Sequence, residues 1–570
     1  MGLHRYALVA LGIVATGAGA PAPTAQPEDA TPAPTPVLAC DPATIQKVAP
    51  PQTTITAATP TATPVPHCRI DGYVTTTDPG PNQVKFRLQL PDHGWTGRYY
   101  FIALGGSAGY VPTDSQIPAG NPLYRGFAVA GTDTGREGNM LDWTFLSDPV
   151  KALDHNHRGA HVVALATQQI TKAYYAATKL YRYMSGCSGG GRMGMEALLR
   201  HPGDFDGLLI GAPGGRSSGS IIKFIAASQQ MMREPGAWLS PAKLAMVEQK
   251  VTATCDASDG ALDQMVWDHR LCRFNVPSLA CAPGRDGADC LSAPEMRSFK
   301  AILDGPRGPN GALIAQPMPI TNTSSWLSFL GPTPPPWSGA ATMENMKKGS
   351  AGYIIATTIS HAFFGPGYDP VTQFNLKSQK DLDAWWAATR RTGWGQPWSP
   401  DIGAFQRGGG KVIFWNGVSD PCCSDVELEQ YYRDAGKAVD GGEPGLQRFA
   451  KLYRMPGMAH CGGGTGPQDG PDTLLDQLIA WVERNRAPGP VVVHRGAERV
   501  RLAFADPATK QVSGVAVPPP AGAPRDFLLC PFPLVSKFDA RRAGQPGAVY
   551  DAGAWSCVAP AKPAVTASAR

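Results

Sequence analysis

Apolar and polar positions follow a strand and helix rhythm in the first part of the chain. Four short apolar runs, each followed by a glycine or a turn residue, are typical of buried strands. These runs are 98–104, 127–132, 180–184 and 208–213. Apolar residues at helical spacing fill 161–180 and 192–200 between them. Strands separated by helices indicate a parallel sheet with crossover helices, which is the α/β class.

This alternation of strand and helix patterns ends near residue 217 and begins again near residue 401. The stretch between holds four cysteines, an acidic loop, proline-rich turns and several tryptophans. After it, apolar runs at 411–416 and 451–455 predict two more strands. A chain of 570 residues exceeds the size at which one core stops growing, so a second unit is expected. We therefore predict an α/β core in two parts, 40–216 and 401–558, with residues 217–400 inserted as a lid domain.

The two ends of the chain show other patterns. His4 and Arg5 precede an apolar stretch that is followed by small residues, which is typical of an export signal. At about 13 residues the stretch is too short to span a bilayer. The predicted boundaries are a signal peptide at 1–25, a low-complexity linker at 26–39 and a disordered tail at 559–570. We expect a secreted or periplasmic protein that is not bound to a membrane.

The charge argues against two kinds of binding partner, and the cysteine content indicates disulfide bonds. The formal net charge is +5, from 51 basic and 46 acidic residues, and no basic run stands out. This balance is too mild to indicate binding to nucleic acid or to an anionic membrane. Twelve cysteines, an even number, favour disulfides in an exported chain. Zinc is the competing interpretation, but the sequence has no C-x-x-C pair.

Ser188 lies in Gly186-Cys187-Ser188-Gly189-Gly190, which matches G-x-S-x-G. The predicted strand before it and the predicted helix after it are the context of a nucleophile elbow, the sharp turn that presents a catalytic serine. The N–H of Gly189, at the helix start, is a candidate donor to an oxyanion. Gly106, after an earlier strand, is the candidate second donor, and an ordinary glycine turn is the alternative.

Chain order in such enzymes places an acid and then a histidine after the serine. Asp420 follows the predicted strand 411–416, and Asp425 is its rival, although it reads as a first-turn residue of a helix. His460 follows the next strand in a glycine-rich loop. Asp420 would orient His460, which would take the Ser188 proton so that an acyl-enzyme forms and water hydrolyses it.

Two cysteines flank the proposed nucleophile and base. Cys187 immediately precedes Ser188, and Cys461 immediately follows His460. If the serine and the histidine are hydrogen bonded, the two cysteines are close enough for a disulfide, which needs Cα atoms about 4.4–6.8 Å apart. A Cys187 nucleophile is the alternative, and the predicted export and the disulfide argue against it.

An acidic loop in the inserted region is a second candidate site. Cys255 and Cys272 bracket Asp256, Asp259 and Asp263 around a glycine turn. Carboxylates and carbonyls are the hard oxygen ligands that calcium prefers, although the spacing is not that of an EF-hand. A solvated acidic turn is the alternative, and the flanking cysteines favour calcium.

At these residues the chain resembles the tannase and feruloyl esterase family. The segments that carry the resemblance are 186–192, 204–213, 409–420, 456–463 and 529–533. They occur in the family's order from about residue 40 to about residue 557, nearly the whole mature chain. The resemblance implies an α/β-hydrolase core, a large inserted lid that shapes the substrate pocket, and ester hydrolysis.

The resemblance also implies a ligand set and a disulfide pattern. Structural calcium would be held by the carboxylates of Asp256, Asp259 and Asp263 and the carbonyls of Ala261 and Met265, and no organic cofactor is expected. The implied disulfides are Cys187–Cys461, Cys40–Cys68, Cys255–Cys272, Cys281–Cys290 and Cys530–Cys557. Cys422 and Cys423 are left over, either as a strained vicinal disulfide or as buried thiols.

The leading hypothesis is a serine hydrolase for small esters of aromatic acids of feruloyl, galloyl or terephthaloyl type. A serine esterase or peptidase for non-aromatic acyl groups is the alternative, as is a catalytically dead, calcium-stabilised binding module. Lid aromatics could clamp a ring, with core packing as their default role. They are Trp326, Trp337, Phe363, Phe364, Trp385, Trp386 and Trp394. Arg390 or Arg391 could bind a free carboxylate, with solvent exposure as the alternative.

Overall fold

A mixed sheet forms the centre of the protein, for which we have a computed structural model. The model describes residues 34–112, 122–214, 217–496, 502–505, 512–515 and 524–560. The predicted signal peptide at 1–25, part of the linker and most of the tail lie outside the described residues. No helix in the described part of the chain is long and apolar enough to cross a membrane.

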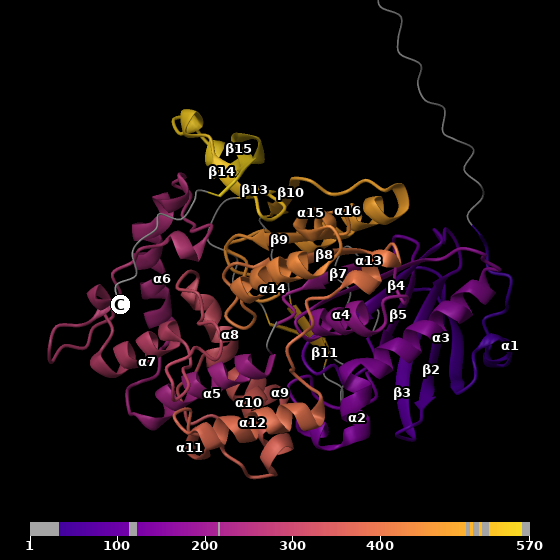
Figure 1. Cartoon of the computed structure of the whole chain (residues 1–570), viewed down its shortest axis with the longest axis horizontal. Helices are drawn as coiled ribbons and strands as arrows, with labels where there is room; N and C mark the ends of the chain where they lie inside the picture. Colours follow the sequence, from indigo (N-terminus) through magenta and orange to yellow (C-terminus); the bar gives the residue numbers. More distant parts are fainter. Residues whose placement is uncertain are drawn as a thin grey trace, which may run out of the picture. The chain divides into compact units, whose positions relative to one another are not determined.

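Among the described residues this sheet has nine strands in the order β1-β2-β3-β5-β4-β6-β7-β8-β9 (Figure 1). The strands are β1 (Thr53–Thr61), β2 (His67–Thr76), β3 (Asn82–Pro91), β4 (Arg98–Ala103), β5 (Ala128–Thr132), β6 (Tyr181–Cys187), β7 (Gly207–Gly211), β8 (Lys411–Gly417) and β9 (Ala450–Met455). β1, β2, β3 and β5 pair antiparallel, whereas all pairs from β5 to β9 are parallel. The predicted parallel sheet is therefore confirmed, and an antiparallel extension that was not predicted precedes it.

Helices cover both faces of the sheet, because alternate residues of a buried strand point to opposite sides. Leu208 and Ile210 of β7 pack in the cluster that contains α3 (Gly159–Tyr174), α4 (Gly189–Arg200) and α14 (Asp425–Ala438). Leu209, between them, packs on the other face with α16 (Gly470–Arg484). This two-sided burial explains the continuous apolar runs from which the strands were predicted. The remaining core helices are α1 (Pro42–Val48), α2 (Pro149–Leu153) and α15 (Gly442–Gln447).

The chain leaves the sheet between β7 and β8, although these two strands are parallel neighbours. Nine α-helices of the described chain lie in this excursion, and Figure 1 shows most of them gathered beside the sheet. They are α5 (Ser217–Arg233), α6 (Pro241–Cys255), α7 (Ala293–Asp304), α8 (Leu327–Leu330), α9 (Met343–Lys348), α10 (Ala351–Phe364), α11 (Pro370–Gln373), α12 (Gln379–Thr392) and α13 (Gly403–Arg407). Most share a hydrophobic cluster of their own, separate from the clusters on the sheet. We refer to residues 217–400 as the lid.

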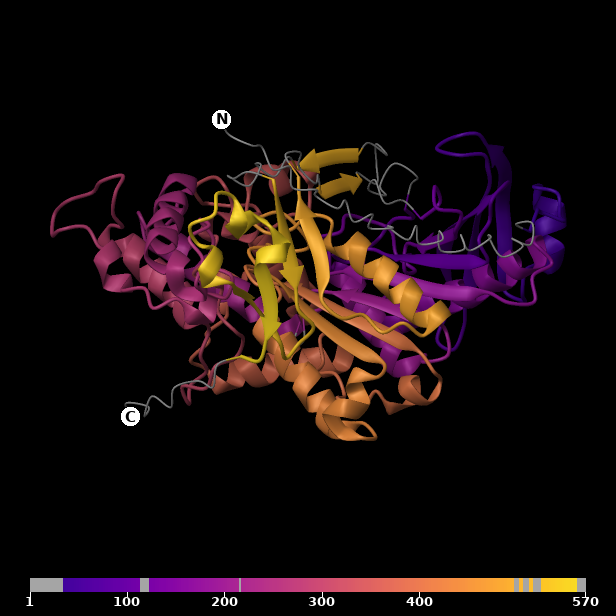
Figure 2. The ribbon, with the colours of Figure 1, turned by 90° about the horizontal axis from the view of Figure 1, so that it is seen from above.

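In the described part of the chain, three two-stranded antiparallel sheets follow α16 towards the C-terminus (Figure 2). They pair β10 (Val491–Arg495) with β13 (Arg525–Leu529), β11 (Leu502–Ala505) with β12 (Val512–Val515), and β14 (Val535–Phe538) with β15 (Trp555–Val558). The pair of β10 and β13 packs on the central sheet, because Val493 and Phe527 join the cluster of α16.

Candidate active site

The predicted nucleophile Ser188 lies in the sharp turn between β6 and α4. Its φ of 61° and ψ of −120° are a conformation that costs a non-glycine residue about 1–3 kcal/mol. The Ser188 N–H donates to the carbonyl of Gly211 at the end of β7, 3.0 Å away, and so holds the turn in place. A Cβ on Gly190 would lie 2.0 Å from the Ala103 carbonyl oxygen, so the motif's last glycine is sterically required. This is the geometry of a nucleophile elbow.

His460 and Asp420 are in contact although they come from loops after different strands. The Nδ1 atom of His460 lies 2.8 Å from Oδ2 of Asp420, whose side chain is buried. The other oxygen of Asp420, Oδ1, accepts the backbone N–H groups of Cys422 and Cys423 at 2.7 and 3.0 Å. These two bonds fix the carboxylate plane, so Asp420 can hold the imidazole in one orientation.

The rival acid, Asp425, is engaged elsewhere. Its Oδ2 accepts a hydrogen bond of 2.9 Å from Nε of Arg454, and its Oδ1 lies 3.3 Å from Nε2 of His269. The Arg454 and His269 side chains hold the pKa of Asp425 below its usual value against the opposing effect of burial. Asp425 therefore belongs to a buried ion-pair cluster at the start of α14.

The charge around His460 raises the proton affinity of its imidazole and so strengthens it as a base. Burial lowers its pKa, but the Asp420 carboxylate and the sulfur of Cys422 outweigh burial and raise the pKa to about 9. Because Asp420 occupies Nδ1, the nitrogen left to exchange a proton with Ser188 is Nε2. The arrangement stabilises the imidazolium that forms when a histidine takes a proton from a serine.

A disulfide joins the elbow to the histidine loop. Cys187 and Cys461 are bonded with their Cα atoms 5.8 Å apart, although 274 positions separate them in the chain. The bond ties the residue before Ser188 to the residue after His460. It also removes the alternative nucleophile, since the sulfur of Cys187 is no longer a thiol.

The two candidate oxyanion donors lie next to each other. A Cβ built on Gly189 would stand 2.0 Å from the Gly106 carbonyl oxygen and 2.8 Å from its nitrogen, so the two backbones touch. Gly189 is the first residue of α4, where N–H groups have no acceptor within the helix. The N–H of Ser107 donates to the Met140 carbonyl at 2.8 Å and is not available. Gly106 and Gly189 therefore remain the candidate backbone donors to an oxyanion.

Three lid residues near the base were missed from the sequence. The ring of Phe329 meets that of His460 edge-on at 5.4 Å, and Phe224 stacks on Phe329 at 5.0 Å. Lys223 is buried and its Nζ donates to the Cys422 carbonyl at 2.9 Å. A lysine within the apolar run 221–227 was the one signal that could have directed attention to this part of α5.

The lid aromatics proposed to clamp a substrate have another role. Trp326, Trp337, Phe363, Trp385 and Trp394 are buried in the lid's own core, and Phe364 and Trp386 pack against it. That burial supports core packing, the default interpretation of these side chains. Arg391 donates to the Phe363 carbonyl at 2.9 Å. Arg390 lines a cavity of about 610 Å³ whose wall includes none of Ser188, Asp420 and His460, so neither arginine is placed at the catalytic residues.

The acidic loop of the lid follows α6 as a short 3-10 turn, Asp256–Asp259. Backbone N–H groups from 261–267 donate to the Asp256 and Asp259 carboxylates, so the segment wraps around them. Asp263 pairs with Arg525 at 2.8 Å, with both side chains fully buried. The bond between Cys255 and Cys272 closes the loop, with Cα atoms 5.1 Å apart.

Three carboxylates lie in this loop, and one of them, Asp263, pairs with the buried Arg525. Burial, followed by the neighbouring charge of Asp263, raises the pKa of Asp259 to about 7. Asp256 and Asp259 have no ion-pair partner in the described part of the chain, and carboxylate oxygens of this kind are the ligands that a hard divalent cation prefers. The residue types and the charge of this loop fit calcium.

The remaining predicted cysteine pairs are also formed in the described chain. They are Cys40–Cys68, Cys281–Cys290 and Cys530–Cys557. Cys422 and Cys423 are thiols, so of the two alternatives the structure has the unbonded one. Disulfides of this number are typical of an oxidising compartment.

Comparison with known proteins identifies the family to which the sequence is similar. The family model described as "Tannase and feruloyl esterase" matches residues 68–558. The chain is 28% identical to the mono(2-hydroxyethyl) terephthalate hydrolase of Piscinibacter sakaiensis, over 88% of this chain and 87% of that protein. It is 26% identical to the probable feruloyl esterase B-1 of Aspergillus flavus, over 76% of this chain and 78% of that one.

Solved structures show the same fold. Feruloyl esterase B from Aspergillus oryzae superposes with a TM-score of 0.71 at 22% identity, covering 90% of this chain and 98% of that one. The tannin acyl hydrolase from Aspergillus niger gives a TM-score of 0.65 at 19% identity, covering 92% and 96%. The α/β-hydrolase fold expected from the sequence is thereby confirmed.

Proposed function

The chain belongs to the tannase and feruloyl esterase family, whose members are carboxylic ester hydrolases, and we propose that it cleaves esters of aromatic acids through an acyl-enzyme on Ser188. The observation that carries this proposal is the contact between His460 and Asp420, which the Cys187–Cys461 bond ties to the nucleophile elbow.

The proposed reaction uses each group in turn. His460 takes the proton of Ser188 while the serine oxygen attacks the ester carbonyl, and Asp420 stabilises the resulting imidazolium. The N–H groups of Gly189 and Gly106 bind the oxyanion of the tetrahedral intermediate. His460 then protonates the leaving alcohol. Water, deprotonated by the same histidine, releases the acid from the acyl-enzyme.

An aromatic acyl group is supported by two observations. The relatives' names specify feruloyl, tannin acyl and terephthalate substrates. In this chain the ring of Phe329, in the lid's core, meets His460 edge-on, so an aromatic surface that prefers stacked or edge-to-face contact with a further ring lies next to the proposed base.

A substrate panel tests the acyl preference. We expect kcat/KM for methyl ferulate, methyl gallate or a terephthalate monoester to exceed that for an aliphatic methyl ester of similar size by at least about tenfold, which corresponds to about 1.4 kcal/mol of added transition-state binding. A peptide amide of one of these acids is the control for peptidase activity. Faster cleavage of the aliphatic ester or of the amide would contradict the proposal.

We further propose that the acidic loop binds structural calcium through Asp256, Asp259 and Asp263 with the carbonyls of Ala261 and Met265. The ion would stabilise the lid, and no step of ester hydrolysis passes through it. Binding at a free calcium concentration 100 times Kd would add about 2.7 kcal/mol to the stability of the folded state.

Removal of calcium is therefore expected to lower the thermal midpoint by roughly 3–5 °C, as measured by calorimetry with EGTA and then with calcium restored. Asp256→Asn is the matched variant, because it keeps the shape of the side chain and removes a ligand charge. Its midpoint should respond less to EGTA than that of the unmodified protein. Equal midpoints with EGTA and with calcium would count against the site.

We propose export on the basis of the N-terminal pattern and the five disulfides among the described cysteines. The expected mature N-terminus lies near residue 26. Mass spectrometry of the protein recovered outside the cytoplasm checks this, and an intact N-terminus there would contradict it.

A further inference from the structure

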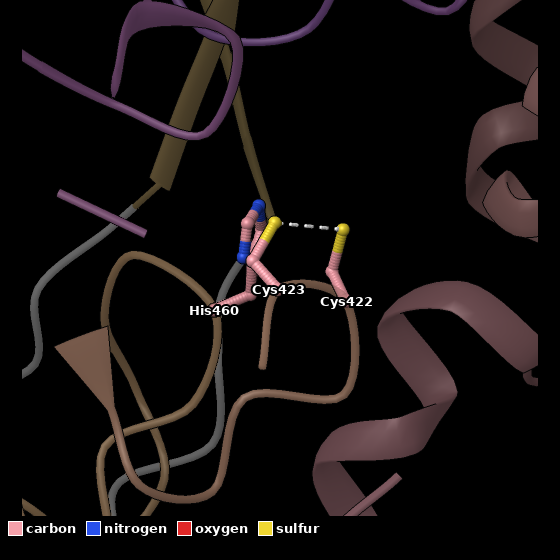
Figure 3. A group of neighbouring side chains, drawn as sticks. All are labelled: Cys422, Cys423 and His460. Atoms are coloured by element: carbon pink, nitrogen blue, oxygen red, sulfur yellow. Dashed lines mark hydrogen bonds between the residues drawn. The ribbon is translucent and has the colours of Figure 1, made fainter. Parts of the chain in front are cut away.

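Two adjacent thiols lie beside the proposed catalytic base. Cys422 and Cys423 are in the turn between β8 and α14, and their sulfur atoms are 3.3 Å apart (Figure 3). The other ten cysteines of the chain are paired in disulfides. The backbone N–H groups of both residues are bonded to Asp420, so the turn that positions the catalytic acid also fixes the two thiols.

The thiols and His460 form a set of possible metal ligands. One ligand atom from each residue, two sulfurs and a ring nitrogen, lies within 4.8 Å of the other two. Zinc binds sulfur at about 2.3 Å and imidazole nitrogen at about 2.0–2.1 Å in tetrahedral geometry, which places two bound sulfurs about 3.8 Å apart. Small side-chain rotations from the observed 3.3 Å separation would reach this arrangement.

The surroundings of the cluster favour ligation by the imidazole. Metal-binding histidines usually donate their second N–H to a carboxylate, which fixes the tautomer and raises the basicity of the ligand. Asp420 makes that contact with Nδ1 of His460, so Nε2 is the nitrogen free for a metal. Two thiols and an imidazole select thiophilic ions such as zinc, cadmium and copper(I) over calcium and magnesium.

Charge at the cluster balances when both thiols ionise. Binding of a divalent ion would release to solvent the protons of both thiols and the Nε2 proton of His460 where the imidazole is protonated, and it would place two thiolates against the two positive charges of the metal. Lys223, bonded to the Cys422 carbonyl, and Asp420 are the charged groups beside the cluster, and they are opposite in sign. Cys422 is partly exposed, whereas Cys423 is buried.

We propose that Cys422, Cys423 and His460 form a binding site for one thiophilic divalent cation, with zinc as the representative ion. The fourth tetrahedral position stays open to water. While the ion is bound, Nε2 of His460 cannot accept the proton of Ser188, so occupation of the site and ester hydrolysis exclude each other. The inhibition rests on the proposed function, whereas the binding does not.

Binding is tested first, on the whole mature protein in calcium-containing buffer. Thiol titration of the unfolded protein should give two free thiols per chain. Cobalt(II) is then added as a spectroscopic probe, and a thiolate-to-cobalt charge-transfer band saturating at one ion per chain is expected. Zinc should abolish the band. Cys422→Ser and Cys423→Ser should each weaken cobalt binding at least about tenfold, because each removes one of three ligands.

A second histidine cluster supplies the matched control. His161, His201 and Asp204 also bring three ligand atoms within 4.8 Å of one another, but without a sulfur. His201→Gln should therefore leave the charge-transfer band unchanged. An equal loss of the band in this variant, the absence of a band with two thiols present, or a count of zero thiols from a vicinal disulfide would each overturn the proposal.

Inhibition is tested second, with each protein compared to its own rate without zinc. Saturating zinc is expected to lower ester hydrolysis at least about tenfold, and a zinc chelator followed by calcium should restore it. The double variant with both cysteines replaced by serine should need at least tenfold more zinc for half inhibition. Equal inhibition of the double variant would overturn the proposal that an ion bound at these cysteines blocks ester hydrolysis. A cobalt charge-transfer band in a protein without esterase activity would support the metal site and refute the proposed function instead.

Discussion

Replacement of Ser188 by alanine is expected to lower kcat for the best aromatic ester by about 10⁴- to 10⁶-fold, with KM changed much less. The acyl-enzyme cannot form without the serine oxygen, and the oxyanion donors and substrate binding alone retain only a small part of the acceleration. Steady-state kinetics with the substrate of highest kcat/KM provide the measurement.

Two controls accompany this variant. Ser278→Ala changes an exposed serine whose hydroxyl donates to the Asn275 carbonyl, and it should leave kcat within twofold. Thermal unfolding of Ser188→Ala should show that the elbow still folds, since alanine occupies the same backbone conformation as serine. Unchanged turnover in Ser188→Ala would refute both the acyl-enzyme and the active-site assignment.

The second large effect is expected for Asp420→Asn, which should lower kcat by about 10⁴-fold. An amide that donates to Nδ1 of His460 would favour the tautomer with its proton on Nε2, and that histidine cannot accept the proton of Ser188. The variant keeps an oxygen that can accept the N–H groups of Cys422 and Cys423, so the turn itself should persist.

Asp425→Asn is the matched control for the acid. It removes the same charge five positions further on, where the carboxylate faces Arg454 and His269. The buried Arg454 still keeps Asp268 as a partner, so a loss of stability of a few kcal/mol is expected together with less than tenfold change in kcat. A larger loss of kcat in Asp425→Asn than in Asp420→Asn would reverse the assignment of the acid.

Much of the core could be predicted from the sequence because its signals are local. Strands buried on both faces are continuous apolar runs, and Ser188 stands in a motif whose flanking strand and helix lie within about ten residues on either side. The antiparallel strands β1 to β3 were missed, since β1 itself lies in a threonine- and proline-rich stretch and the other two follow it. Half-buried strands of this kind alternate in polarity and give a weaker signal.

Contacts between distant segments could not be predicted in the same way. The pairing of β7 with β8 spans the whole lid, and only the flanking cysteines Cys187 and Cys461 indicated that the serine and histidine loops meet. The lid aromatics were recognisable as a group, but which of them face inward depends on helix packing. The position of Phe329 against His460 likewise follows from how the lid docks on the sheet.

The Cys187–Cys461 bond closes a covalent ring that contains the whole lid, since residues 217–400 lie between its two ends. A protease that cuts an exposed loop of the lid would therefore leave a single molecule, with the serine turn and the histidine turn still tied to each other. The two halves of the sheet on either side of the cut would also remain paired as β7 and β8. This topology would allow the lid to be nicked, or over evolution to be lengthened and rebuilt, without separating the proposed nucleophile from the proposed base.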